Sequence, residues 1–106
     1  MFDYREIKAK RAEEGVSNLM VRWLITKEMD AESFAMRHFD IAPKGFSLLH
    51  THPWEHEVSI LEGDGKVVSE KEEKEFKPGT VIFIPAGEQH QFRNKGTKVV
   101  KFLCLI

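Results

Sequence analysis

Three of the chain's five histidines lie within one short stretch, HTHPWEHE, that starts at residue 50. Imidazole nitrogens bind transition metals and also transfer protons near neutral pH, so the stretch could serve either chemistry. On a strand, alternate side chains share a face, which would place His50 and His52 side by side. Pro53 removes a backbone donor and breaks the strand before the next candidate, which is either His56 or Glu57.

A fourth histidine, His90, lies far along the chain in another segment that is rich in strand-forming residues. If the sheet curls, His90 can face the same interior as His50 and His52. A single histidine is most often an ordinary surface or core residue. A group of three followed by a distant fourth, in a frame of glycine and proline, favours a metal site over a chance cluster.

The segments that must position these histidines alternate between short apolar runs and Gly or Pro punctuation from Leu19 onward. This spacing predicts nine or ten short strands and an all-β sandwich or barrel, with 46–52 as the strand that carries the first two histidines. Residues 5–15 are polar and predict a short helix or a loose arm. The charged run 70–77 predicts a solvated turn between strands, and the short segment 75–76 at its end is the next element of the strand set.

A length of 106 residues suits one compact domain. We expect an N-terminal arm over residues 1–18 and a barrel over residues 19–106. A small antiparallel sheet has exposed edges unless it closes or pairs, so a homodimer is also expected.

Two motifs in the chain resemble those of the cupins, a family of small β-barrels. The first motif is GFSLLHTHPWEHEVSILEG, residues 45–63, and the second is GTVIFIPAGEQHQFRN, residues 79–94. The second fits the family pattern at each of its fixed positions, which are Gly79, Pro85, Gly87, His90 and Asn94. The first departs from it twice: four residues instead of five separate Gly45 from His50, and His56 stands where the family usually has Glu. The resemblance implies an all-β, cupin-type double-stranded β-helix, or jelly-roll barrel.

The resemblance also implies a four-histidine metal site formed by His50, His52, His56 and His90. The six-residue spacing to Gly63 favours His56 over Glu57, and so does the parity that His56 shares with the apolar residues that follow it. A one-residue change of register would exchange the two faces, so Glu57 stays open as the alternative ligand.

Histidine ligands suit one divalent transition metal ion, namely Mn, Fe, Ni, Cu, Co or Zn, and the resemblance favours Mn or Fe. It implies a metal-dependent oxidoreductase of the dioxygenase type that acts on a small organic molecule. The alternatives are a metal-dependent isomerase and a non-enzymatic metal- or ligand-binding or sensory cupin. No helix-turn-helix segment accompanies the motifs.

Alternation along the strands predicts which side chains face the interior. In the last strand the central Lys101 should face solvent, which turns Phe102 and Cys104 inward. By similar parity the pocket wall is expected to hold Trp23, Met36, Ile60, Phe92, Phe102 and Cys104. Such residues are more often core than substrate contacts.

The composition limits the partners. Sixteen Lys and Arg offset seventeen Asp and Glu, and no long run carries one sign, so we expect no nucleic acid and no anionic membrane as partner. No apolar run approaches the ~20 residues that span a bilayer, and the N-terminus does not read as a signal peptide. With Cys104 as the single cysteine, these features favour the cytoplasm.

Overall fold

The computed structural model describes residues 1–13 and 16–106, and this part of the chain forms nine strands and two single-turn 3-10 helices. The elements in chain order are η1 (Tyr4–Glu6), β1 (Lys10–Glu13), β2 (Val16–Ile25), η2 (Lys27–Met29), β3 (Met36–Ile41), β4 (His56–Glu62), β5 (Gly65–Val68), β6 (Glu73–Phe76), β7 (Val81–Ile84), β8 (Gln91–Asn94) and β9 (Val100–Leu105). No helix in it is long and apolar enough to cross a membrane.

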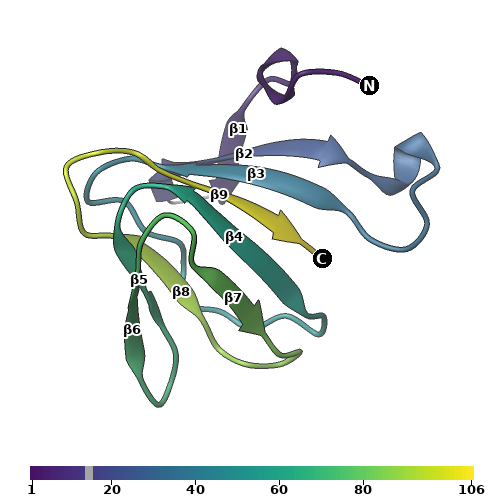
Figure 1. Cartoon of the computed structure of the whole chain (residues 1–106). Helices are drawn as coiled ribbons and strands as arrows, with labels where there is room; N and C mark the ends of the chain where they lie inside the picture. The colour runs from purple at the N-terminus through teal and green to yellow at the C-terminus, as the bar shows by residue number, and fades with distance from the viewer. Residues whose placement is uncertain (14–15) are drawn as a thin grey trace.

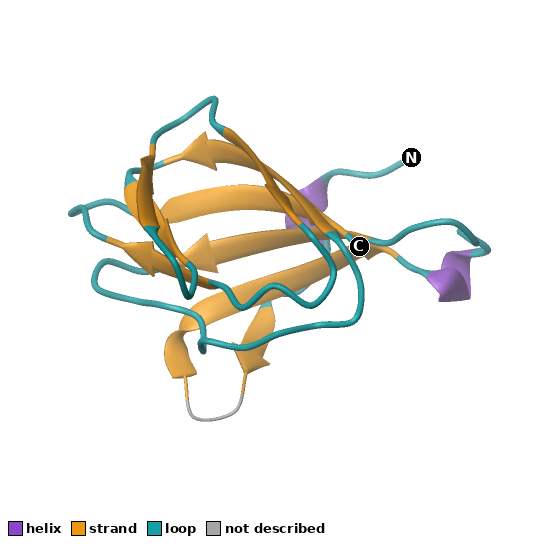
Figure 2. Ribbon diagram, turned by 90° about the horizontal axis from the view of Figure 1, so that it is seen from below, coloured by secondary structure: helices purple, strands orange, loops and turns teal. Residues whose placement is uncertain are grey.

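The strands form two sheets that face each other. The larger sheet has the order β1-β2-β3-β9-β4-β7 and the smaller one β6-β5-β8 (Figures 1 and 2). Each pair of neighbouring strands is antiparallel. The expected all-β jelly-roll barrel is confirmed. Strands β1 and β7 form the edges of the larger sheet, and the expected homodimer stays a prediction.

The core lies between the two sheets and follows the alternation of the strands. In β9, the two predicted inward residues, Phe102 and Cys104, are buried, and so is Val100. The ring of Phe102 stacks on Phe39 within the larger sheet and on Phe92 from the smaller one, with both centroid distances at 4.9 Å. These aromatic rings therefore join the two layers.

Two segments differ from the sequence-based expectation, and both form strands at the edge of a sheet. Residues 10–13 form β1, which pairs with β2, so the short helix or loose arm expected for 5–15 is wrong there. Within the run 70–77, expected as a solvated turn, residues 73–76 form β6, in which only Phe76 is buried. Edge strands tolerate charged side chains because one side faces solvent, so polar composition hid both strands. Strand β2 runs across the expected boundary at residue 18, and the division into arm and barrel stays a prediction.

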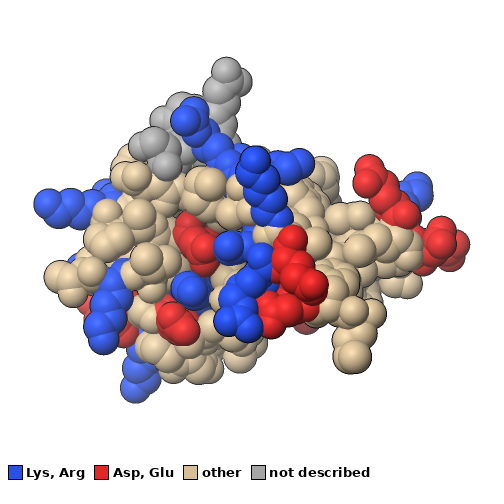
Figure 3. Space-filling model, turned by 90° about the horizontal axis from the view of Figure 1, so that it is seen from above, with Lys and Arg blue, Asp and Glu red and all other residues tan. Residues whose placement is uncertain are grey.

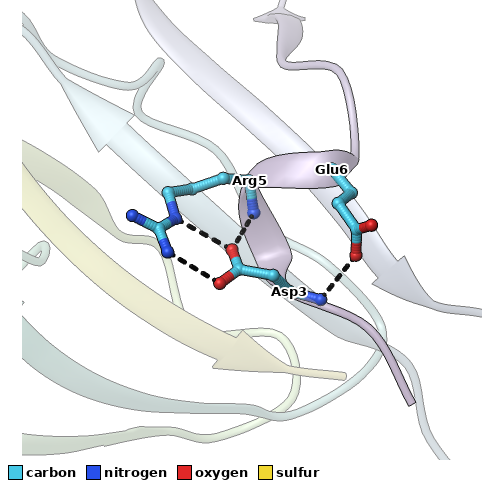
Figure 4. A network of polar contacts seen from close by, with 3 residues as sticks. All are labelled: Asp3, Arg5 and Glu6. Atoms are coloured by element: carbon cyan, nitrogen blue, oxygen red, sulfur yellow. Dashed lines mark hydrogen bonds and ion pairs between the residues drawn. The ribbon is translucent and has the colours of Figure 1, made fainter.

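The N-terminal turn covers the outer face of the larger sheet. Asp3 caps η1, since its carboxylate accepts a hydrogen bond from the backbone N–H of Arg5 and its own N–H donates to the Glu6 side chain (Figure 4). The same carboxylate also accepts hydrogen bonds from two guanidinium nitrogens of Arg5, at 2.9 and 2.8 Å. Next to this cap, the Tyr4 ring stacks on His38 at 4.5 Å. His38, the one histidine outside the two motifs, is thus buried on the outer side of β3.

Charges of both signs lie beside one another on the molecular face that is seen from above (Figure 3). Oppositely charged side chains also pair in the structure, as Arg22 does with Asp40 at 3.0 Å between Nη1 and Oδ2. The surface drawn there therefore shows alternating charge rather than a field of one sign.

Asn94, the last residue of the second motif, joins β8 to two other parts of the fold. Its side-chain amide donates to the carbonyls of Ile41 at 2.9 Å and Lys98 at 2.7 Å, and its Oδ1 accepts from the Gly96 N–H at 2.8 Å. The side chain is buried, so its removal would leave buried carbonyls without a donor.

We expect Asn94→Ala to lower the free energy of unfolding by about 2 kcal/mol or more. Asn18→Ala is the control, since Asn18 is exposed on β2 and should change stability by less than about 0.5 kcal/mol. Both are measured by urea denaturation followed by circular dichroism. Equal unfolding midpoints for Asn94→Ala and the wild type would contradict this role.

Gly63, which closes the first motif, is required by the close approach of two strands. Its φ is +85°, and an added Cβ would lie 2.8 Å from the Cα of Val100. Side chains are disfavoured at this φ, and the backbone of β9 leaves no room for one. The spacing of the motif thus places Gly63 directly after β4, where the chain passes close to the backbone of β9.

Candidate metal centre

Backbone pairing sets His50 opposite His90. The His50 N–H donates to the His90 carbonyl at 3.2 Å, and the His90 N–H donates to the His50 carbonyl at 3.0 Å. The expected strand over 46–52 is wrong, because this segment makes only isolated bridges, at Phe46 and His50, with the chain around β8. The two bridges still hold the segment along β8, which positions His50 without a continuous ladder.

The ring nitrogens of three histidines converge. Nε2 of His50 and Nε2 of His52 are 3.1 Å apart, and one nitrogen from each of His50, His52 and His90 lies within 4.8 Å of the others. Two imidazole ligands at right angles around a metal, each at 2.0–2.1 Å, would have nitrogens about 3.0 Å apart. The pair also lies at hydrogen-bond distance in the absence of a metal. The cluster therefore fits a divalent transition metal ion.

His56 borders this cluster and Glu57 does not. His56 begins β4, is buried, and its ring lies 5.1 Å from that of His52 and 4.7 Å from that of His90 between centroids. Its Nδ1 is buried and has no hydrogen-bond partner in the described part of the chain. Glu57 is exposed on the opposite face of β4, as the parity predicted. The structure thus assembles three histidines with close nitrogens and places a fourth ring next to them.

Neighbouring groups orient two of these rings. His90 Nδ1 lies 3.1 Å from the carbonyl oxygen of Glu88, and since a carbonyl only accepts, Nδ1 carries the hydrogen. In the neutral ring this leaves His90 Nε2 with a lone pair, as a metal ligand needs. The Trp54 ring stacks on His52 at 4.7 Å and 8°, and the Gly87 N–H donates to the His52 carbonyl at 2.7 Å. Gly87 of the second motif thus helps to hold His52 of the first motif in place.

Two histidines of the site, His52 and His56, have lowered pKa values that favour the neutral ring. Burial, followed by the neighbouring histidines and Arg37, lowers the pKa of His52 to about 4. Burial also lowers the pKa of His56 to about 3, with His90 and Arg37 as the next causes. Metals bind the neutral imidazole, so at neutral pH these two rings need not lose a proton before binding.

These depressed pKa values predict that the metal-free protein loses stability as the pH falls. Between pH 6.5 and about 4, the unfolded chain takes up protons at His52 and His56 that the folded chain does not. The free energy of unfolding should therefore decrease over this window and stop changing, for these two groups, below about pH 3. Urea denaturation of chelator-treated protein at several pH values measures this slope. A His52→Gln/His56→Gln variant should show a shallower one, and an unchanged slope would contradict the assignment.

A mostly apolar cavity of about 450 Å³ opens beside the cluster. All four cluster histidines line it, and so do Trp23, Phe92, Phe102 and Cys104, the other residues that the structure brings to the wall as expected. Two expected residues are elsewhere. Ile60 is buried in the core and does not line the cavity, and Met36 lies on the outer face of β3 in a separate depression.

Sequence reasoning missed Arg37 and Phe39, which both line the cavity. Alternation in MRHFDI was the available signal: Arg37, Phe39 and Ile41 share one face of β3, while His38 and Asp40 share the other. Phe39 and Ile41 are the apolar members, so their face is the interior one. Arg37 was hard to place because a cation is unexpected in that position. Glu88, which precedes His90 in the second motif, is exposed and does not line this cavity.

Comparison with known proteins identifies relatives of this arrangement. The cupin domain model matches residues 37–106. A curated relative, 1-methylthio-D-xylulose 5-phosphate methylsulfurylase from Rhodospirillum rubrum, is 32% identical over 67% of this chain and 46% of its own length. The chain spans about half the length of the curated relatives it matches.

Solved structures share the whole architecture. The polyketide cyclase RemF from Streptomyces resistomycificus is 32% identical, with a TM-score of 0.91 over 99% of this chain and 76% of that one. A predicted oxalate decarboxylase from Thermotoga maritima is 24% identical, with a TM-score of 0.85 over 99% and 96% of the two chains, and shows the fold alone. Because the family model covers most of the chain, including all four cluster histidines, the chain belongs to the cupin family.

Proposed function

We propose that this chain is a metal-dependent oxidoreductase of the dioxygenase type that acts on a small organic molecule. The observation that carries the proposal is the 3.1 Å approach of the His50 and His52 nitrogens at the wall of an apolar cavity. In this proposal His50, His52, His56 and His90 hold one divalent metal ion, with Mn or Fe favoured.

The chain's own residues would hold the ion and shape its surroundings. The four rings supply neutral nitrogen ligands, and Trp54 packs on His52 at the cavity wall. Apolar walls limit the access of water, which strengthens electrostatic interactions inside. When bound, a redox-active ion would supply Lewis acidity and one-electron chemistry with O2.

A second candidate is non-redox Lewis-acid chemistry, such as a cyclisation or isomerisation. The likeness to RemF, a polyketide cyclase that covers 99% of this chain at 32% identity, favours it. Both candidates use the same histidines and the same cavity. They differ in whether O2 is consumed.

The test is O2 uptake by protein loaded with Mn or Fe, assayed with diketones, flavonols and phenols, and repeated without O2. The dioxygenase proposal predicts O2 uptake that the His90→Ala variant lacks. Product formation without O2, again lost in His90→Ala, would support the Lewis-acid candidate instead. No conversion with any metal or compound would contradict both and would favour a binding or sensory role.

A further inference from the structure

Arg37 stands out as a cation on the wall of a cavity that contains no acidic residue among its described lining side chains. It projects from β3 between Trp23 of β2 and Cys104 of β9, its direct partners in the register of the sheet. Its guanidinium lies 5.2 Å from the centroid of the Trp23 ring and 4.9 Å from that of Phe39. Two aromatic rings therefore fix the position of the cation.

The hydrogen bonds that Arg37 makes leave part of its capacity unused. Nη2 donates to Cys104 Sγ at 3.1 Å, and sulfur is a weak acceptor. Nε is buried and has no hydrogen-bond partner within residues 1–13 and 16–106. Arginine stays charged at any ordinary pH, and a partly desolvated charge without a counter-ion is costly. An anionic ligand oxygen would supply the missing partner.

The cavity also indicates the shape of that ligand. Flat rings line it from both sheets and from the loop before β4, namely Trp23, Phe39, Trp54, Phe92 and Phe102. A volume of about 450 Å³ is in the range of sites for small organic ligands. With Arg37 in its wall, the cavity carries a positive charge and no compensating carboxylate among the lining residues described.

We propose that Arg37 is the substrate-binding residue that selects a planar, conjugated anion, such as a carboxylate, phenolate or enolate. Its guanidinium pairs with the anionic oxygen while the aromatic walls contact the conjugated plane. The inference rests on the proposed function for its physiological meaning, because it names the substrate class of the same cavity. Binding to Arg37 itself requires no metal, so the two proposals can be tested separately.

The experiment compares trans-cinnamate with its neutral near-isostere trans-cinnamamide. Trp23 and Trp54 are the two tryptophans of the chain, and both line the cavity, so quenching of their fluorescence reports binding. Dissociation constants are measured for chelator-treated and for metal-loaded protein. The variants are Arg37→Gln, Arg37→Lys, and the control Arg93→Gln, whose arginine lies over the Phe46 ring outside the cavity.

We expect the wild type and Arg93→Gln to bind cinnamate at least about 10-fold more tightly than cinnamamide in both forms. Arg37→Gln should bind the two ligands equally, and Arg37→Lys should keep part of the preference. If Arg37→Gln does not fold, as judged by circular dichroism, the Arg37→Lys ratio decides: a ratio equal to the wild type's would overturn the proposal.

The proposal is also overturned if the wild type does not distinguish the ligands, or if its preference appears only with metal and survives in Arg37→Gln. That last result would leave the metal-dependent function standing. Conversely, a metal-free preference that depends on Arg37 supports this inference even if no metal-dependent turnover is found.

Discussion

Replacing His50 and His90 together by alanine is expected to abolish stoichiometric metal binding. These residues face each other across a pair of backbone hydrogen bonds and supply two of the three converging ring nitrogens. Loss of a residue that only supports a ligand costs about 10–100-fold in metal affinity, so loss of two ligands should cost more than about 100-fold. Metal content is measured by inductively coupled plasma mass spectrometry after loading and dialysis.

His38→Gln is the matched control for this experiment. His38 is also buried, but it lies under Tyr4 on the outer face of the larger sheet, so its replacement should leave the metal content unchanged. Circular dichroism confirms that each variant is folded before its metal is counted. Full metal content in the His50→Ala/His90→Ala variant would exclude the proposed site.

A second large effect on metal affinity is expected when His56 is replaced, but not when its neighbour Glu57 is replaced. His56→Leu should lower metal affinity by about 10-fold or more and alter the absorption spectrum of cobalt-loaded protein, because a nitrogen ligand is lost. Glu57→Gln should leave affinity within about 2-fold of the wild type, since its side chain is exposed on the other face of β4.

Competition with a chromophoric chelator measures both affinities. The reverse ranking, with a large loss for Glu57→Gln and none for His56→Leu, would require the strand to change register and would contradict the four-histidine site. Equal affinities for the wild type and both variants would leave a centre of three histidines.

Much of the fold and of the candidate site could be predicted from the sequence, because each depends on local pattern. The alternation of apolar residues in β9 predicted correctly that Phe102 and Cys104 face the interior. The parity of His56 with the buried Val58 and Ile60 gave its burial. His50 and His52 were expected together for a reason that turned out to be wrong: they lie on an irregular segment rather than on a strand.

What could not be predicted depends on contacts between distant segments. The backbone pairing of His50 with His90 spans 40 residues, and no local pattern specifies it. Edge strands β1 and β6 have polar sequences because one side of each faces solvent. The composition therefore suggested a loose arm in place of β1 and a turn in place of β6. Arg37 is stabilised by Trp23 and Phe39, one of them on another strand, and neither contact can be read from the hydropathy of β3.

A crystal structure of the metal-loaded protein, with anomalous scattering recorded at the absorption edge of the metal, tests the central claim most directly. The four-histidine account predicts one peak in the cavity, with a nitrogen of each of His50, His52, His56 and His90 at about 2.0–2.2 Å and Glu57 pointing to solvent. A cavity without a peak, or a peak held by surface carboxylates instead, would contradict it.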